Sequence, residues 1–341
     1  MNTTQPIPDY LQPTWIDRLG MGHVLLGLVL LVYPAVASPF FLTQIGGYTM
    51  IMGTLGLSLM MLAGYGGMVS LAQITVAGIA GYAIAVFGDN ATGIMGFGWP
   101  WWIATPYAIL IAAVTSALIG WISARTEGVY TIMITLAIAM AVYYFTQQNY
   151  ALFNGHSGYS GIPMPAFWDV VWRDPVPFYY VCLGIAVFSY SGVLYARSST
   201  FGLTLQALRD NARRMRAIGY DVTAHKVFAW FIAGVIAGLA GVLLVWFNGR
   251  ISPGTIGANA AIDVLIIAVL GGLRHPIGAF IGALVVVLLK TFAIDLIGAD
   301  RFNTLIGLVF LAIVFASPDG LLGLWERFRS KLENTSVRPR L

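Results

Sequence analysis

Long apolar segments with almost no charge recur along the whole chain, and they constrain its fold more than any other feature. Most of these segments approach the roughly 20 residues that an α-helix needs to cross the hydrocarbon core of a bilayer. Hydrophobic residues make up 58% of the 341-residue chain and charged residues 9%, unlike a soluble domain. The ten segments are 23–44, 47–64, 66–88, 99–123, 128–146, 178–196, 224–246, 258–273, 276–296 and 303–317. The sequence therefore predicts an all-α integral membrane protein with about ten transmembrane helices.

The lysines and arginines set the predicted orientation, because cytoplasmic loops of membrane proteins carry an excess of positive charge. With the N-terminus inside, fourteen of the eighteen cationic residues lie on the inner side. The four exceptions are Arg173, Arg250, Lys290 and Arg301. Ten crossings return the chain to its starting side, so both termini are expected in the cytoplasm. The expected parts are an N-terminal segment (1–22), one transmembrane domain (23–317) and a cytoplasmic tail (318–341).

Two long loops interrupt the transmembrane domain. The outer one, 147–177, contains four prolines and glycines that preclude a span. The inner one, 197–223, contains the charged stretch LQALRDNARRMRAIGYD. Apolar residues recur in this stretch at helical spacing, at Leu205, Leu208, Ala212 and Met215. Arginines occupy an adjoining face, at Arg209, Arg213 and Arg216.

This inner stretch predicts a short amphipathic helix that ends near Gly219, where glycine is favoured. Two roles fit such a helix. In the first role the helix lies on the anionic inner leaflet, where attraction to lipid stabilises binding by about 1 kcal/mol for each arginine. In the second role it docks onto a cytoplasmic protein. Asp210 and Asp221 stand among the arginines, which suits specific pairing better than general attraction to lipid.

Polar residues inside the predicted spans are candidates for a solute pathway, because ionisable groups are expensive in a membrane. Asp263, in the outer part of the eighth segment, is the clearest, although a carboxylate in the first turn of a helix also favours the helix dipole. Lys290 is expected to extend toward the outer interface. Two uncharged pairs are each expected on one helix face, Ser70 with Gln73 and Thr131 with Thr135. These side chains either line the pathway or bond to neighbouring helices.

Glycines four residues apart predict close helix packing in the bundle. Gly234 with Gly238, and Gly278 with Gly282, fit this spacing. The close contacts are expected within the chain, with an interface between two chains as the alternative.

Several motifs, in the same order along the chain, resemble one family of membrane proteins. The inner loop contains SSTFGLTLQALRDNARRMRAIGYDVTAHKVFAWFIAGVIAGLAG. The other motifs are GGMVSLAQITVAGIAGYA, EGVYTIMITLA, GHSGYSGIP, IDVLIIAVLGG and SPDGLLGL. Together they resemble the permeases of ABC importers, specifically the family for branched-chain amino acids, urea and short amides in its LivM-like branch. Arg274 and His275 depart from this pattern, because the family usually has small residues there.

The resemblance implies a permease subunit in the cytoplasmic (inner) membrane of a bacterium. Its partners would be a second related permease subunit, two ATPase subunits, and a periplasmic or extracellular substrate-binding protein. Nucleic acid is not expected, because no basic tail or stripe is present. The coupling segment of the family maps onto Ala207, Leu208, Arg209, Ala212, Arg213, Met215, Arg216 and Gly219. The glycine-rich outer loop would receive the binding protein, with Asn154, Gly155, His156 and Tyr159 as docking candidates.

The chain lacks the features of an enzyme. None of its three lysines follows a glycine, so it has no phosphate-binding P-loop, and ATP would be hydrolysed on partner chains. The single cysteine, Cys182, suggests no metal site, and no cofactor is expected in this chain. The rival interpretations are a proton- or ion-coupled secondary transporter of small polar solutes and a membrane enzyme. Few ionisable groups in the spans argue against the first, and the absence of a nucleophile motif or paired carboxylates argues against the second.

Overall fold

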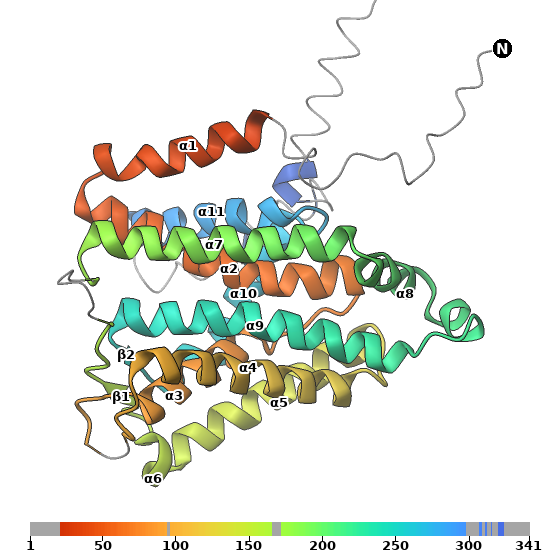
Figure 1. Ribbon diagram of the computed structural model, residues 1–341, viewed down its shortest axis with the longest axis horizontal. Coiled ribbons are helices and arrows are strands. Elements are labelled where there is room, and N and C mark those ends of the chain that lie inside the picture. Colours follow the sequence, from red (N-terminus) through yellow and green to blue (C-terminus); the bar gives the residue numbers. More distant parts are fainter. Residues whose placement is uncertain are drawn as a thin grey trace, which may run out of the picture.

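The computed structural model describes residues 21–93, 96–165, 172–297, 307–308, 311, 315 and 320–323. This part of the chain is almost entirely helical (Figure 1). The helices are α1 (Met21–Val36), α2 (Tyr48–Met60), α3 (Gln73–Phe87), α4 (Trp101–Ser123), α5 (Val129–Gln148), α6 (Tyr150–Phe153), α7 (Pro175–Ser198), α8 (Thr200–Ala217), α9 (Val222–Asn248), α10 (Ala258–Gly271) and α11 (Pro276–Ile297). Two short strands, β1 (Tyr159–Ser160) and β2 (Arg250–Ile251), form an antiparallel ribbon. The predicted all-α class is confirmed.

Among the described residues, six helical segments are long and apolar enough to cross a membrane. They are Phe41–Tyr65, Trp101–Ser123, Val129–Gln148, Pro175–Ser198, Val222–Asn248 and Pro253–Gly271. Shorter apolar helices cover Gly27–Val36, Gln73–Phe87 and Pro276–Phe292. Most of the predicted segment 303–317, both termini and most of the predicted tail fall outside the described residues. Ten crossings and cytoplasmic termini therefore stay predictions.

The boundary between the first two predicted spans is wrong. The predicted segments leave the gap at residues 45–46, but the chain turns at residues 37–38. The helix then resumes at Pro39, whose missing N–H and fixed φ suit a first helical turn. It continues through a π-helical segment, Phe41–Gly47, into α2. A Cβ at Gly46 would lie 2.8 Å from the ring of Tyr179 on α7, so this glycine permits close helix packing.

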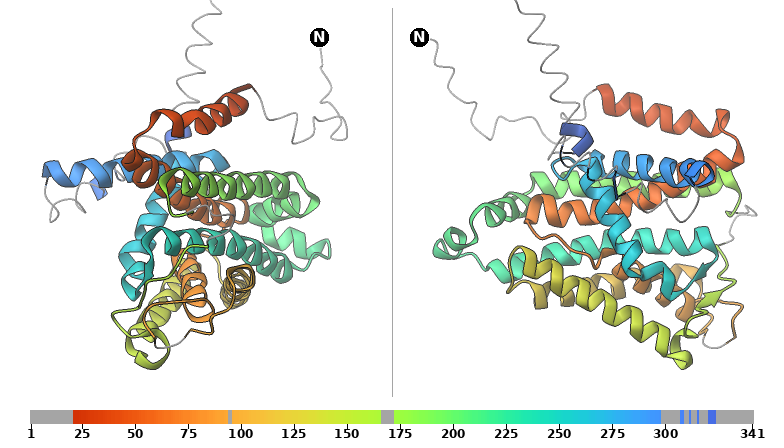
Figure 2. Two further views of the ribbon diagram at one scale, coloured as in Figure 1. Left: turned by 60° about the vertical axis from the view of Figure 1, so that its left-hand side comes forward. Right: turned by 180° about the vertical axis from the view of Figure 1, so that it is seen from behind.

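The helices pack around α2 and α9, which are buried along most of their length. A helix that is apolar on every side is expected in the interior of such a bundle. Helix α9 contacts α4, α3 and α2, and α2 also contacts α11 and α10. In Figure 1 helices α2, α4, α7 and α9 run roughly along the long axis of the molecule, and Figure 2 shows the same bundle from two other sides.

Small residues set the closest helix approaches. A Cβ at Gly234 would clash with Ala113 and Ser116 of α4, and one at Gly241 would clash with the backbone of Ala77 in α3. Gly278 and Gly282 in turn face Gly271 of α10. The prediction that these glycines serve packing within the chain is therefore confirmed for these contacts.

The loops gather at two ends of the bundle. At one end, β1 pairs with β2, with Tyr159 opposite Ile251, and α6 lies beside them (Figure 1). At the other end, α8 lies close to the π-helical turn Met61–Tyr65 that follows α2. The sequence assigned these loops to the outer and the inner side, respectively. The end with β1, β2 and α6 is therefore called the outer end, and the end with α8 the inner end. These names follow the charge distribution of the sequence.

Candidate functional site

The first half of α8 anchors the inner loop to the bundle. The Ser199 hydroxyl caps this helix by accepting a hydrogen bond from the Gly202 amide at 3.3 Å. Leu205 and Leu208 are buried, and Leu205 lies against Gly66 at the end of the segment that follows α2. These two leucines occupy the predicted apolar face. This half of α8 is therefore a structural part of the inner end.

The predicted continuous helix from Ala207 to Gly219 is wrong, because α8 breaks at Asn211. The backbone of Asn211 is extended, with φ −158° and ψ 90°. Its side-chain oxygen accepts a hydrogen bond from the Arg214 amide at 3.0 Å, so it caps a second short helix. Asparagine is unfavourable inside helices and favourable at their N-caps, which explains the break. The second half ends at Gly219, whose φ of +97° fits the predicted glycine stop.

The break separates the faces that the sequence pattern had joined. Ala212 and Met215 are half-buried, whereas Leu205 and Leu208 lie in the bundle interface. Arg213 and Arg216 are exposed on the second half, and Ala207 is half-buried on the first. In Figure 1 the second half of α8 extends away from the bundle, beyond the first half of α8 and the nearby end of α9. The apolar stripe is therefore not one surface, and the projecting part presents mainly arginine.

Arg209 points toward the bundle and not toward the projecting half. Its Nη1 donates a hydrogen bond to the Gly64 carbonyl at 2.6 Å, and Nη2 lies 3.0 Å from Asp210 Oδ1. Its side chain also packs over Gly67, where a Cβ would come within 2.7 Å of Arg209 Cγ. Arg209 thus joins α8 to the segment after α2, a contact that helical periodicity had not predicted.

A cavity of about 410 Å³ opens at this inner end. Its lining residues come from three segments that are distant in sequence: Gly66–Met68, Thr126–Gly128 with Thr131, and Leu208–Arg213 with Lys226. Charges of both signs line it: the carboxylates of Glu127 and Asp210, and the cations of Arg209, Arg213 and Lys226. Of the pathway candidates, Thr131 reaches this cavity, and its hydroxyl lies 3.2 Å from the Thr126 hydroxyl. The candidate coupling segment and one pathway candidate therefore share one space.

The predicted third span begins later than expected, at Gln73, because residues 67–72 are not helical. Ser70 thus does not share a helix face with Gln73, and that prediction is wrong. The Ser70 hydroxyl accepts a hydrogen bond from the Ala72 amide at 3.1 Å. A break in a helix within the membrane leaves backbone N–H groups that need partners, and side chains of this kind supply them.

Two other pathway candidates also bond to neighbouring segments. The Thr135 hydroxyl accepts a hydrogen bond from the Leu71 amide at 3.2 Å, and Thr131 and Thr135 share the buried face of α5 as predicted. The Gln73 side-chain oxygen accepts a hydrogen bond from the Ser58 hydroxyl at 3.1 Å. Gln73 Nε2 is buried without a hydrogen-bond partner in the part of the chain that the structure describes. Gln73 is therefore the candidate among these that keeps an unused donor in the core.

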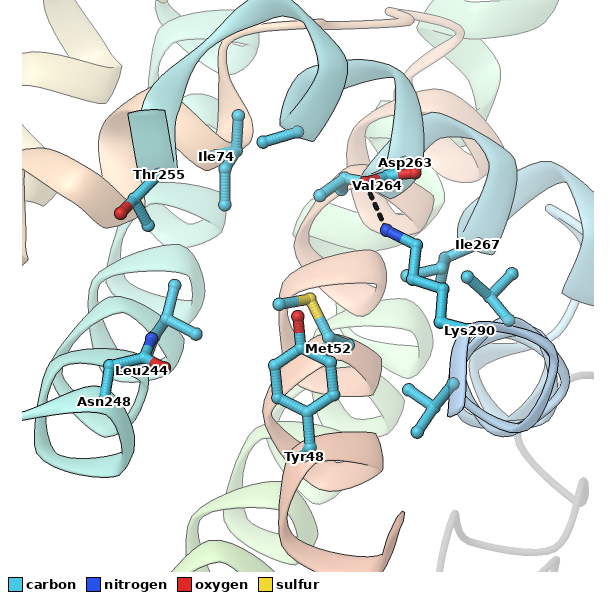
Figure 3. A pocket seen from close by; sticks show the side chains of 13 residues that line it. Tyr48, Met52, Ile74, Leu244, Asn248, Thr255, Asp263, Val264, Ile267 and Lys290 are labelled. Atoms are coloured by element: carbon cyan, nitrogen blue, oxygen red, sulfur yellow. Dashed lines mark hydrogen bonds and ion pairs between the residues drawn. The ribbon is translucent and has the colours of Figure 1, made fainter. Parts of the chain in front are cut away.

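Asp263 forms an ion pair with Lys290, a partner that sequence reasoning missed. Lys290 Nζ lies 2.5 Å from Asp263 Oδ2, joining α10 to α11 (Figure 3). The Asp263 side chain is 30% exposed and the Lys290 side chain 31%. They lie in the wall of a cavity of about 160 Å³. The available signal was the presence of opposite charges in the outer halves of two consecutive spans.

The outer loop folds into a compact ribbon, which buries some of its docking candidates and leaves others exposed. Tyr159 is fully buried, and its hydroxyl donates a hydrogen bond to the Leu152 carbonyl at 2.6 Å. Burial also raises the pKa of this phenol, which favours the protonated donor. Gly155 is buried, and Asn154 has a left-handed backbone and donates to the Gly158 carbonyl at 2.8 Å. Tyr159 is therefore a poor contact residue, and His156 is the exposed candidate of the four.

No group of three or more metal-ligating His, Cys, Asp or Glu side chains occurs among the described residues. Cys182, the single cysteine of the chain, is buried in α7. The chemistry that this part of the structure offers is hydrogen bonding and ion pairing.

In the part of the chain that the structure describes, six apolar helices of membrane-spanning length in one bundle define a multi-pass membrane protein. Residues 41–315 match the family model described as "Branched-chain amino acid transport system / permease component". This match covers most of the chain, and the chain therefore belongs to that family of importer permeases. The predicted resemblance is confirmed.

Curated relatives support this assignment over nearly the whole length. The chain is 27% identical to the high-affinity branched-chain amino acid transport system permease protein LivM of Salmonella typhimurium, over 92% of this chain and 78% of that protein. It is also 27% identical to LivM of Escherichia coli, over 91% and 77%. A more distant relative, at 22% identity over 73% of this chain and 79% of that protein, is the ribose import permease protein RbsC of Haemophilus influenzae. No solved structure matches the chain.

Proposed function

We propose that this chain is the transmembrane permease subunit of an ATP-driven importer in the inner membrane of a bacterium. Its substrate would be a branched-chain amino acid or a related small solute, as the names of its LivM relatives suggest. The partners would be a second related permease subunit, two ATPase subunits and a periplasmic binding protein. The observation that carries the proposal is the projecting, arginine-rich half of α8 in a chain of this family.

The two halves of α8 suit a coupling element. The second half presents exposed Arg213 and Arg216, which would meet acidic groups on the rim of an ATPase cleft. The first half is held in the bundle by Leu205 and Leu208. The projecting half is joined to the bundle through the first half at Asn211 and through α9, which begins at Val222, so a push on it would reach the bundle along both.

Arg209 would pass such a movement on to the pathway. It bonds the Gly64 carbonyl and packs over Gly67, at the start of the non-helical segment 67–72. That segment is bonded in turn to Thr135 of α5 through the Leu71 amide. A shift of α8 would therefore displace the segment that separates α2 from α3, and with it the inner wall of the bundle.

Co-purification with an ATPase subunit tests the proposal, and Ala212→Glu is the informative variant. Ala212 is half-buried at the start of the projecting half, directly after the cap residue Asn211. A glutamate in a first helical turn favours the helix dipole, so the local fold should survive. Against the acidic groups proposed for the rim of the cleft, however, a like charge costs several kcal/mol. We expect Ala212→Glu to lose ATPase association and uptake together, with normal membrane insertion.

The matched control is Ala151→Glu, which places the same charge at an exposed position of the outer end. This variant should keep ATPase association and membrane insertion, and those two readouts alone are compared, because the outer end is the proposed docking side for the binding protein. If Ala212→Glu behaves like the control, the projecting half is only an element of the lipid surface, and the proposed coupling is wrong.

The outer end would receive the binding protein. A photoreactive residue at exposed His156 should crosslink to that protein in cells. The same residue at buried Tyr159 should crosslink within the permease instead. Capture of permease segments alone from His156 would favour a purely structural ribbon.

A further inference from the structure

The cavity beside Asp263 and Lys290 has an unusual combination of walls. One side carries the ion pair, with Asp263 on α10 and Lys290 on α11. Figure 3 shows the Tyr48 hydroxyl directed toward the cavity, with Asn248 and Thr255 on the side opposite Lys290. The remaining lining is mainly aliphatic: Met52, Ile74, Leu244, Val264, Ile267 and Val286.

The ion pair is only partly used and is not sealed from its surroundings. In the described part of the chain, the carboxylate and the ammonium bond only each other, and each side chain is about a third exposed. A lysine ammonium has three donors and a carboxylate has two acceptor oxygens, so both retain bonding capacity. Charged groups at this depth are expensive and usually face an interior pathway. The pair is therefore placed to exchange its internal contact for contacts to a ligand.

We propose that this cavity binds a zwitterionic aliphatic α-amino acid during transport, through Asp263 and Lys290. The α-ammonium group of the ligand pairs with Asp263, and its α-carboxylate pairs with Lys290. The side chain of the ligand lies against the aliphatic wall. This inference rests on the importer function proposed above, and it assigns the chemical class that this part of the chain accepts.

Charge balance favours a zwitterion over other small solutes. The pair and the ligand are each neutral overall, so every ionised group keeps a partner of opposite sign after exchange. A purely cationic or anionic ligand would leave one buried charge unpaired, which is unfavourable at low dielectric. An uncharged amide or urea can accept and donate hydrogen bonds but offers no charge to separate the pair.

The size of the cavity fits a small aliphatic side chain. Its volume is about 160 Å³, and an apolar cavity of roughly 150 Å³ is large enough to bind benzene. Apolar walls with a few placed polar groups are the usual composition of a small-molecule site. The pocket therefore combines the two features that a branched aliphatic amino acid requires.

Equilibrium binding of radiolabelled L-leucine to the full-length chain in lipid nanodiscs tests this proposal. The preparation includes any ATPase subunit that co-purifies and excludes the binding protein. We expect Asp263→Asn and Lys290→Gln each to weaken leucine binding by about tenfold or more, because each removes a charged hydrogen-bond partner. The control Asp174→Asn, an exposed carboxylate at the outer end of α7, should bind as the wild type does. Leucinamide and 4-methylpentanoate, which each lack one charge, should compete at least about tenfold less well than leucine.

The double variant Asp263→Asn with Lys290→Gln separates ligand binding from a structural role. It leaves no unpaired charge, so it should melt at a temperature close to the wild type while leucine binding stays lost. Leucine binding by the double variant within about twofold of the wild type would show a merely structural pair. Absent leucine binding by the wild type, or urea binding with the same dependence on both residues, would also overturn the proposal. Co-purification of the ATPase, scored in the same samples, reports on the importer function separately.

Discussion

Arg209→Ala should impair the transmission of movement from α8 to the bundle, while α8 itself stays anchored. The substitution removes the 2.6 Å hydrogen bond from Nη1 to the Gly64 carbonyl. A hydrogen bond from a charged group contributes about 1.5–3 kcal/mol. The contact with Asp210 contributes little, at most about 1 kcal/mol, because its side chains are 42% and 69% exposed. The loss therefore comes mainly from the bond to Gly64.

The assay is uptake per ATP hydrolysed by the complete importer in proteoliposomes. If Arg209 transmits movement to the segment after α2, a loss of this size corresponds to roughly tenfold or more in coupling. Association with the ATPase should persist, because Leu205 and Leu208 still anchor the first half of α8. The control Asp210→Asn tests the weak partner of Arg209 and should change uptake per ATP by less than about fivefold.

Three results would refute this reasoning. Unchanged uptake per ATP in Arg209→Ala would show that the bond to Gly64 transmits nothing. An equal loss in Asp210→Asn would assign the effect to the charge pair and not to the backbone contact. Loss of ATPase association in Arg209→Ala would instead mean that Arg209 belongs to the docking surface, as the sequence pattern had predicted.

Three further outcomes follow from the packing and the loops. Gly241→Ala should lower the free energy of unfolding by about 1–3 kcal/mol or more, because the added methyl group overpacks against α3. The control Gly184→Ala, where the methyl group enters open space, should leave the stability unchanged. Equal melting temperatures of the two variants would contradict the packing. In a Cys182→Ala background, cysteine at Ser157 should react with a membrane-impermeant reagent in intact cells and cysteine at Arg213 should not; the reverse pattern would invert the topology. The purified chain should not hydrolyse ATP, because it has no Gly-Lys phosphate loop; activity that survives removal of contaminating ATPase would refute this.

Helices were predicted well where one apolar run forms one uninterrupted helix. Segment 99–123 corresponds to α4, and segment 224–246 corresponds to α9, within two residues at each end. Each is a single uninterrupted helix of membrane-spanning length, so length and hydropathy suffice to predict it. Segment 66–88 was predicted less well, because residues 67–72 are apolar but leave the helix. Neighbouring side chains such as Thr135 make that departure possible by bonding the exposed backbone.

Single residues with two possible uses account for the main errors. Gly46 lies in the predicted gap between the first two segments, but it stands within a helical segment that packs closely against Tyr179 on α7. Asn211 stands in a regular helical pattern, yet its side chain caps a new helix. Tyr159 lies in a polar loop that would suit a docking surface, but the ribbon with β2 buries it. In each case the local pattern allowed both uses, and a contact made by the fold chose one.

Hydropathy and charge already establish the membrane class, most helices and the expected orientation. These properties act between one segment and its solvent, lipid or water, so they can be evaluated without knowing the neighbours. The candidate sites depend instead on pairs brought together by packing. Asp263 meets Lys290 across 27 residues, and Arg209 meets the Gly64 carbonyl across 145. Such pairs form because helices stack at particular rotations and depths, and periodicity within one helix carries no information about its partner.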